Sequence, residues 1–243
     1  MAERSCLVAG GSGHIGGAIA RELAWRGWDV GVHWRTVREA AERVAEDCAD
    51  AGARAFVLRA DITSRAAADA LVADFESRAG APPDAIVCAH GIFRDAPFLR
   101  ASEEDWDDTV AANLSGPAWL VRAAAERWAA TGGGHAILLG SHAASAGRIG
   151  GAAYAASKAA LEGLARSVSR EMGRAGVRVN VVIPPFIEQG MGARAGSGFK
   201  SRACSRSVLG RSGTADEFAK LVASLAEAEG VSGQIVRFDS RIV

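Results

Sequence analysis

The chain has 243 residues, of which 49% are hydrophobic, 23% charged and 6% aromatic, and this length and composition suit one α/β domain. Its 28 Lys and Arg residues balance its 28 Asp and Glu residues, so it lacks the positive surface that binds phosphate backbones or anionic lipid. No apolar run approaches the ~20 residues that cross a bilayer, and we expect neither nucleic acid nor membrane as a partner.

Short apolar runs alternate with stretches of helical period along the chain. The runs that predict strands cover residues 6–9, 29–34, 55–59, 85–89, 136–139, 177–183 and 234–238. The stretches that predict helices cover residues 15–26, 36–51, 66–79, 103–130, 152–175 and 215–228. Strands that are apolar on both faces and separated by helices form a parallel sheet covered on each side. The sequence therefore predicts a single α/β domain over 1–243, with a doubly wound sheet of about seven mainly parallel strands and helices on both faces.

One segment breaks this alternation. Residues 188–212 are rich in Gly, Ser and Arg and show no clear period. The segment carries five basic residues and one acidic residue, a net charge of +4 in a neutral chain. A loop of this length is either a functional lid or a solvated surface loop. We expect a lid or substrate loop at about 186–212 that meets an anionic substrate or carrier, and the solvated loop stays as the alternative.

The four cysteines, Cys6, Cys48, Cys88 and Cys204, form no CxxC pair and do not cluster with histidine. This spacing favours neither a disulfide framework nor a metal site. The chain also leads from its first residues directly into an apolar strand, without a signal-peptide pattern. We therefore expect buried, reduced thiols and a cytoplasmic location.

A glycine-rich turn lies between the first predicted strand and the first predicted helix. It reads Gly10, Gly11, Ser12, Gly13, His14, Ile15 and Gly16. Gly11, Gly13 and Gly16 fit the GxGxxG spacing, which allows a tight turn and a close approach of backbone to a pyrophosphate. The N-terminus of the following helix supplies N–H donors and partial positive charge to the phosphates. This turn predicts a dinucleotide site.

The end of the second predicted strand bears on which dinucleotide binds. A carboxylate there would accept hydrogen bonds from the ribose 2′-hydroxyl and favour NAD(H). The sequence has His33, Trp34, Arg35 and Thr36 instead, and Arg35 can pair with a 2′-phosphate. We therefore expect NADP(H), with a plain surface arginine as the alternative interpretation of Arg35.

The single tyrosine of the chain, Tyr154, stands four residues before Lys158 in a predicted helix. Positions i and i+4 share a helix face, so the ammonium of Lys158 lies about one turn from the phenol. A nearby cation favours the phenolate and lowers the phenol pKa from its ordinary value of about 10, which would make Tyr154 a usable acid or base. Ser141 follows the fifth predicted strand, where its hydroxyl can bond a substrate carbonyl.

Taken together and in this order, these motifs resemble the short-chain dehydrogenase/reductase superfamily, in the single-domain Rossmann form that includes 3-oxoacyl-[acyl-carrier-protein] reductases. The resemblance extends over essentially the whole chain. It covers the glycine turn, Asp61, Asn113, Ser141, Tyr154, Lys158 and the segments 179–182, 209–211 and 231–234.

The resemblance implies a role for each of these residues. Tyr154 would be the proton donor, Lys158 would bind the nicotinamide ribose and lower the phenol pKa, and Ser141 would orient the carbonyl. Asn113 would sit at a helix irregularity and hold a water that relays protons to Lys158. The further residues implied as cofactor contacts are Asp61, Ile62, Ala89, His90, Gly91, Pro184, Ile187 and Gln189.

The chain departs from the family pattern at several of these contacts. His14 replaces a glycine of the turn, where it could donate to the pyrophosphate or cap the turn, and we expect the cap. His90 stands in a segment that keeps only its last glycine, Gly91, and it could face the cofactor or be structural. Pro185 excludes a positive φ where the family has glycine, and Gln189 replaces a threonine that binds the carboxamide.

The resemblance implies an NADPH-dependent ketoreductase acting on a 3-oxoacyl thioester, bound to a carrier protein or to coenzyme A. Two alternatives stay open: a dehydrogenase or reductase of a small alcohol, sugar or other ketone, and a non-catalytic NADP-binding partner subunit. An acyl carrier protein is a candidate partner. A homotetramer is the expected assembly by resemblance, and a dimer is the next.

Overall fold

The protein is described here from a computed structural model, which covers residues 4–241. Seven strands form one sheet in the order β3-β2-β1-β4-β5-β6-β7, and every neighbouring pair is parallel. The strands are β1 (Ser5–Ala9), β2 (Asp29–Trp34), β3 (Ala55–Arg59), β4 (Ala85–Cys88), β5 (Gly134–Leu139), β6 (Val177–Ile183) and β7 (Ile235–Arg237). The predicted doubly wound sheet is confirmed.

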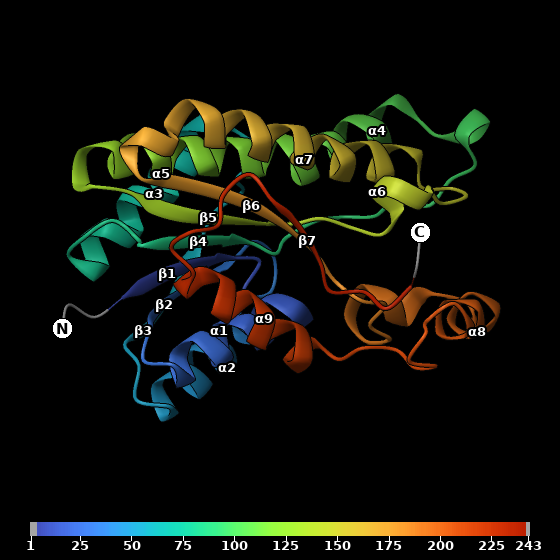
Figure 1. Cartoon of the computed structure of the whole chain (residues 1–243), viewed down its shortest axis with the longest axis horizontal. Helices are drawn as coiled ribbons and strands as arrows, with labels where there is room; N and C mark the ends of the chain where they lie inside the picture. The colour runs from blue at the N-terminus through green and yellow to red at the C-terminus, as the bar shows by residue number, and fades with distance from the viewer. Residues whose placement is uncertain (1–3, 242–243) are drawn as a thin grey trace.

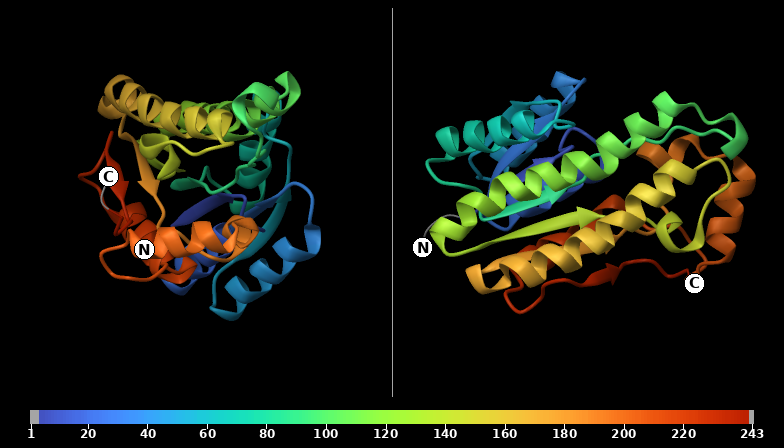
Figure 2. Two further views of the ribbon diagram at one scale, coloured as in Figure 1. Left: turned by 90° about the vertical axis from the view of Figure 1, so that its right-hand side faces the viewer. Right: turned by 90° about the horizontal axis from the view of Figure 1, so that it is seen from above.

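Helices cover both faces of this sheet (Figure 1). One layer holds α1 (His14–Trp25), α2 (Arg38–Asp50) and α9 (Ala215–Glu227). The other holds α3 (Arg65–Ala79), α4 (Glu103–Val110), α5 (Gly116–Thr131) and α7 (Ala152–Met172), with α5 and α7 running side by side (Figure 2). Each layer encloses its own apolar core, built around Phe218 on the first face and around Phe75 and Trp128 on the second. Within residues 4–241, no helix combines the length and apolar character needed to cross a membrane.

The helix predicted over 103–130 is interrupted. Between α4 and α5 the backbone forms a π-helical turn, η2 (Ala111–Ser115). The sequence explains the interruption, because Pro117 has no backbone N–H and cannot donate to the carbonyl of Asn113, as a residue at i+4 does in an α-helix. Asn113 therefore lies at the centre of a helix irregularity, where the resemblance placed it.

The segment at 186–212 contains helical structure that its composition does not predict. It forms a 3-10 turn, η4 (Gly190–Arg194), and a short helix, α8 (Ser197–Ser205), which projects beyond the sheet at the right of Figure 1. The segment is therefore not an irregular loop throughout, although its sequence shows no clear period. The helix is too short to show a period, and Phe199, Arg202 and Ala203 are its positions that line the cavity of the candidate site.

Short elements complete the chain. Two 3-10 turns, η1 (Phe98–Arg100) and η3 (Gly173–Ala175), and the one-turn helix α6 (Ala143–Ala146) lie in connections. Helix α9 begins as the sequence indicates, with Thr214 and Glu217 forming a reciprocal capping box. After β7 the chain returns beside the end of the 186–212 segment, where Ser207 and Arg241 form an antiparallel bridge.

Candidate active site

A cavity of about 680 Å³ opens at the carboxyl ends of the parallel strands. Successive strands end at its wall, and the sheet order reverses between β1 and β4, the position where doubly wound sheets bind their ligands. Nearly all the residues predicted from the sequence line this cavity. The two that do not are Gly11 and Asn113.

The glycine turn is packed so tightly that a side chain has no room at Gly10 or Gly16. Gly10 has φ +79°, and a Cβ there would lie 2.7 Å from the backbone nitrogen of His90. A Cβ at Gly16 would lie 2.2 Å from the carbonyl oxygen of Gly10. Gly11 packs against β2 instead of the cavity, because its Cβ would overlap the side chain of Val32. The turn thus brings bare backbone to the cavity wall.

His14 lies where the glycine turn meets α1. The N-cap residue of α1 is Gly13, which has no side chain to form a capping hydrogen bond. His14 is the first residue of the helix. Its exposed ring lies beside Gly190 of the 186–212 segment, where φ is +59°. The N–H groups of the first turn of α1 therefore stay available to a ligand, because the first turn of a helix has no intrahelical acceptors for them. Together with the backbone cradle at Gly10 and Gly16, this turn fits a dinucleotide pyrophosphate.

Side chains that directly follow β2 and β3 line the cavity on the other side of the glycine turn. Arg35 and Asp61 are both about half exposed, and they face each other with 3.8 Å between Nη1 and Oδ2. Oδ1 of Asp61 accepts a hydrogen bond from the Thr63 hydroxyl at 3.0 Å. Ile62 lies beside them in the cavity wall. A cation, a carboxylate and an apolar surface thus meet where the adenosine half of a dinucleotide would lie.

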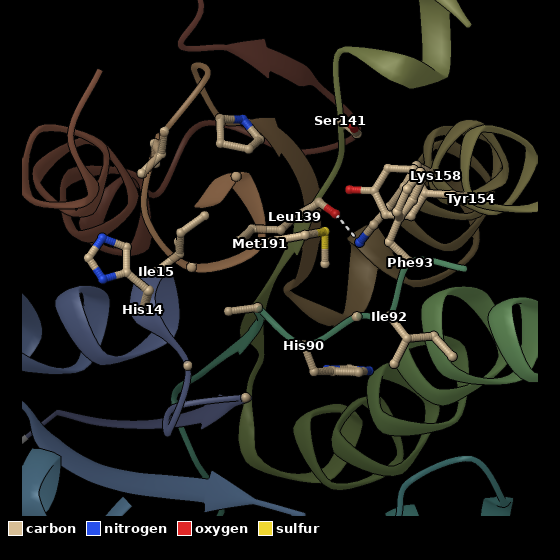
Figure 3. A pocket seen from close by; sticks show the side chains of 18 of the residues that line it. His14, Ile15, His90, Ile92, Phe93, Leu139, Ser141, Tyr154, Lys158 and Met191 are labelled. Carbon is tan, nitrogen blue, oxygen red and sulfur yellow. Dashed lines mark hydrogen bonds between the residues drawn. The ribbon is translucent and has the colours of Figure 1, made fainter. Parts of the chain in front are cut away.

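Three of the four predicted catalytic side chains, Ser141, Tyr154 and Lys158, meet at the far end of the cavity (Figure 3). Tyr154 and Lys158 come from consecutive turns of α7, and Ser141 follows β5. The buried ammonium of Lys158 donates to the carbonyl of Leu139 at 2.7 Å and lies 6.0 Å from the centre of the Tyr154 ring. Oγ of Ser141 accepts from the backbone N–H of Ala143 at 3.2 Å, which fixes its direction.

The pKa values of this group differ from the sequence expectation. Burial raises the pKa of Tyr154, and a hydrogen bond with Ser141 and the charge of Arg148 offset only part of this rise. Burial also lowers the pKa of Lys158 to about 8. Tyr154 is therefore a protonated phenol at neutral pH, and the expected lowering of its pKa by Lys158 is not found.

Asn113 supports this group from behind the cavity wall. Its fully buried amide forms two hydrogen bonds with the backbone of Ile92: Oδ1 accepts from the N–H at 2.8 Å, and Nδ2 donates to the carbonyl at 2.9 Å. Gly91 leaves room for this contact, because a Cβ there would lie 2.9 Å from Oδ1 of Asn113. The π-helical turn is thus tied to the strand end that carries Ala89, His90 and Gly91.

His90 lines the cavity between the glycine turn and the π-helical turn. Burial, together with the neighbouring His33 ring and Lys158 ammonium, lowers its pKa to about 3. The ring is therefore neutral at every physiological pH, and it presents polar nitrogens without adding charge to the cavity.

The substrate end of the cavity contains residues that sequence reasoning missed. Its apolar wall includes Phe93, Phe186, Met191 and Phe199. Four arginines, Arg148, Arg202, Arg206 and Arg241, also line the cavity, and among residues 4–241 the only acid in the lining is Asp61 at the opposite end. Arg241 is paired with the buried carboxylate of Asp239, which lies 3.5 Å from Nδ1 of His142. Only the net positive charge of 188–212 hinted at this lining, since the other partners are distant in sequence.

Comparison with known proteins agrees with this geometry. Residues 9–240 match the family model described as Enoyl-(Acyl carrier protein) reductase. The 3-oxoacyl-[acyl-carrier-protein] reductase FabG of Staphylococcus aureus is 32% identical over 235 residues, which are 96% of this chain and 95% of that protein. The (3R)-3-hydroxyacyl-CoA dehydrogenase of Mus musculus is 35% identical over 231 residues, which are 92% and 89% of the two chains.

A solved structure of a dehydrogenase/reductase from Sinorhizobium meliloti superposes with a TM-score of 0.91 at 30% sequence identity, covering 99% of this chain and 95% of that one. The named relatives are oxidoreductases of CH–OH and C=O groups. The glycine turn, the paired Tyr154 and Lys158 and these full-length matches lead to one conclusion: the chain belongs to the short-chain dehydrogenase/reductase family.

Proposed function

We propose that the protein is an NADPH-dependent ketoreductase that reduces a 3-oxoacyl thioester to the 3-hydroxyacyl product, with Tyr154 as the proton donor. The observation that carries this proposal is the Tyr154 hydroxyl, which points into the cavity that begins at the glycine turn and lies there with Ser141 and Lys158 (Figure 3). Relatives whose names specify 3-oxoacyl and 3-hydroxyacyl thioesters support the choice of substrate.

Each residue has a part in the proposed reaction. NADPH, when bound, supplies the hydride, and the protein supplies the binding site and the proton. The Ser141 hydroxyl donates to the carbonyl oxygen and holds it beside Tyr154. The raised pKa of Tyr154 keeps a proton on the phenol until negative charge develops on that oxygen, which then takes the proton. The charged Lys158, backed by the Leu139 carbonyl, binds the ribose and stabilises the phenolate that forms.

The cofactor choice rests on Arg35. It lies in the cavity wall where a carboxylate would select NAD(H), and its planar guanidinium suits a 2′-phosphate. Within the described residues its only acidic partner is Asp61, at 3.8 Å and half exposed, so the ion pair is weak enough to yield to a phosphate.

The thioester is favoured over a smaller ketone by the lining of the substrate end. An apolar wall suits an acyl chain, while Arg202 and Arg206, which have no acidic partner in the part of the chain described, lie at the cavity rim. A phosphopantetheine arm, on coenzyme A or on an acyl carrier protein, carries its phosphate away from the thioester and would place it at such a rim.

We also propose that the protein forms a homotetramer, or otherwise a dimer, in the cytoplasm. Trp106 on α4 and Trp119 on α5 are each more than a third exposed on one helical layer, and exposed indoles on such a surface favour subunit contacts, which would bury them. The free cysteines fit a reducing compartment.

The test compares wild type with Tyr154→Phe by following NADPH oxidation with a short 3-oxoacyl thioester. The substitution removes one oxygen and keeps the ring that packs against Phe93. Turnover by wild type that falls at least a hundredfold in the variant, with unchanged NADPH affinity, supports the reaction and the proton donor. NADPH binding without turnover of any carbonyl compound would contradict it and favour a non-catalytic subunit.

A further inference from the structure

A row of aromatic rings and one guanidinium leads from the catalytic tyrosine to helix α8. The rings of Tyr154 and Phe93 meet edge to face, with centroids 5.2 Å apart at 84°. The guanidinium carbon of Arg148 lies 4.2 Å from the centre of the Phe93 ring and 5.0 Å from that of Phe199. Phe199 in turn meets the ring of Phe186, with centroids 5.5 Å apart. Arg148 thus lies between two aromatic rings, those of Phe93 and Phe199.

The members of this row come from separate parts of the chain. Phe93 follows β4, Arg148 lies in the connection between α6 and α7, and Phe199 belongs to α8. Of the side chains of α8, Phe199 is the only large apolar one, and the others are small or polar. The contact with Arg148 is therefore the principal attachment of α8 to the loop that precedes the catalytic helix.

The loop that carries Arg148 is itself fixed. Arg148 faces the carboxylate of Asp95 at 3.6 Å, and the backbone N–H of Ala96 donates to the carbonyl of Gly150 at 3.0 Å. Gly150 has φ +73°, and a Cβ there would overlap the Asp95 carboxylate. These contacts fix the loops 93–96 and 147–151 relative to each other. The planar guanidinium of Arg148 therefore packs on the Phe199 ring from a loop whose position is fixed.

The other end of the segment is held by the chain terminus. Oγ of Ser207 and Oγ of Ser240 are 2.5 Å apart, and the N–H of Val208 donates to the carbonyl of Ser240 at 3.1 Å. The segment that contains α8 is thus held at both ends, and the contact made by Arg148 is the one next to the catalytic group.

We propose that Arg148 is a positioning residue, which fastens α8 over the substrate end of the cavity and holds the Phe93 ring against Tyr154. A guanidinium is suited to this place, because it is planar, keeps its charge and attracts an aromatic face on each side. Fastening α8 brings Phe199, Arg202 and Ala203 into the cavity wall and so shapes the site for the acyl thioester. This part of the inference rests on the proposed function.

The first test uses proteolysis to measure how firmly α8 is attached, and it does not depend on enzyme activity. The chain has three lysines, and only Lys200 lies on α8. Lys158 is buried, and Lys220 lies on α9, so a lysine-specific protease can report on α8 separately. A lysine-specific protease should therefore cut a detached α8 after Lys200 and release fragments 1–200 and 201–243. Arg148→Met keeps the apolar stem and removes the charge, and we expect it to speed this cut by about tenfold or more while cleavage at Lys220 stays as in wild type.

The matched control is Arg38→Met, which removes an exposed arginine that pairs with Glu42 on α2, away from the cavity. It should leave cleavage at Lys200 unchanged. Variants of Phe199, the partner of Arg148 in this contact, provide an independent test if Arg148→Met folds poorly. Phe199→Tyr retains an aromatic face and should stay protected, whereas Phe199→Leu should be cut as fast as Arg148→Met, and the double variant should be no worse than either single one.

The second test measures how the loss of the Arg148 contact changes the kinetics of the proposed reaction. In Arg148→Met we expect the KM for a 3-oxoacyl thioester to rise about tenfold and kcat to fall, with NADPH affinity unchanged within about twofold. Arg148→Lys should lie between, because an ammonium keeps the charge and loses the planar contact. Wild-type cleavage at Lys200 and wild-type KM in both Arg148→Met and Phe199→Leu would overturn the inference. Fast cleavage of Arg148→Met, in a protein whose wild type reduces no thioester, would uphold the fastening and refute the proposed function.

Discussion

The backbone N–H of Gly10 donates to Nδ1 of His33 at 3.0 Å, and Nε2 of the same ring lies 3.1 Å from the carbonyl of Ala60. Nδ1 must be unprotonated to accept, so Nε2 carries the proton and donates to Ala60. A single neutral imidazole, 3% exposed, thus joins the glycine turn after β1 to the ends of β2 and β3. Burial lowers the pKa of His33, which favours this neutral form.

His33→Phe should weaken both the fold and the proposed cofactor site. The ring keeps its volume, but the Gly10 N–H loses its acceptor, a loss worth about 1–3 kcal/mol for a buried donor. We expect a lower free energy of unfolding and a higher Kd for NADPH. His135→Phe is the control, because it breaks a histidine bond of equal burial, to Asn180 at 2.8 Å, away from the cavity, and should leave the NADPH Kd unchanged. Equal Kd values for His33→Phe and wild type would contradict this role.

The same histidine gives the stability a pH dependence. The unfolded chain binds a proton on His33 below about pH 6.5, while the folded protein resists it, so stability should fall as pH decreases below that value, by up to ~1.4 kcal/mol per pH unit for each such group. His90 and His135, with pKa values of about 3 and about 4, act in the same direction. The slope measured by denaturant unfolding at pH 5 to 7 should therefore be shallower in His33→Phe, without vanishing.

The sequence predicts the parts of this molecule that local patterns determine. Strands 29–34, 55–59 and 177–183 have the predicted boundaries, because apolar runs there end at turns. The glycine turn and the spacing of Tyr154 and Lys158 locate the cavity for the same reason. Contacts between distant segments leave no local pattern, and the position of Arg148 between Phe93 and Phe199 is one of them. The π-helical turn is an intermediate case, since Pro117 marks it once the helix is known.

Arg35→Ala should change the cofactor preference. Removing a guanidinium that pairs with a 2′-phosphate costs about 1.5–3 kcal/mol, so the Kd for NADPH should rise by roughly ten- to a hundredfold. The Kd for NADH should stay within about twofold, because the other contacts are shared. Fluorescence titration of both cofactors measures this, with Arg38→Ala as the control arginine on α2. A similar loss for NADPH and NADH would exclude the assigned role.

Replacing Arg202 and Arg206 by glutamine tests whether the cavity rim binds a phosphate. The double variant should raise the KM for a 3-oxoacyl-CoA by about three- to tenfold, because exposed charge pairs contribute up to ~1 kcal/mol each. The KM for the same acyl group on N-acetylcysteamine, which has no phosphate, should not change. Arg194→Gln is the control, since Arg194 belongs to the same segment and does not line the cavity. An equal effect on the two thioesters would rule out phosphate binding.

The reduction should slow in mildly alkaline solution. The pKa of Lys158 is lowered to about 8 by burial, so its ammonium loses its proton as pH rises through that value. The neutral amine binds the ribose and the developing phenolate less strongly, and kcat should decrease above about pH 8. Stopped-flow measurement of NADPH oxidation between pH 6 and 10 checks this. A rate that stays constant to pH 10 would show that Lys158 keeps its charge in the complex.

Gly91→Ala should reduce activity more than stability. The new Cβ would lie 2.9 Å from Oδ1 of Asn113 and 3.7 Å from Nζ of Lys158. The first distance is too short, so the amide must leave its two bonds with Ile92 and displace the π-helical turn. We expect kcat to fall at least about tenfold, because catalytic groups lose rate with small displacements. Gly230→Ala, at a position with open space around the Cβ, is the control and should behave as wild type.

Asn113→Ala separates the overlap from other effects of the added methyl group. With the Asn113 amide removed, the Cβ at position 91 no longer meets Oδ1. The double variant that combines Gly91→Ala with Asn113→Ala should therefore be as active as Asn113→Ala alone. If the two losses multiplied instead, Gly91→Ala would act independently of Asn113, through Lys158 or the cofactor contact. The comparison of kcat among the four proteins therefore decides whether the strand end after β4 positions the catalytic group through Asn113.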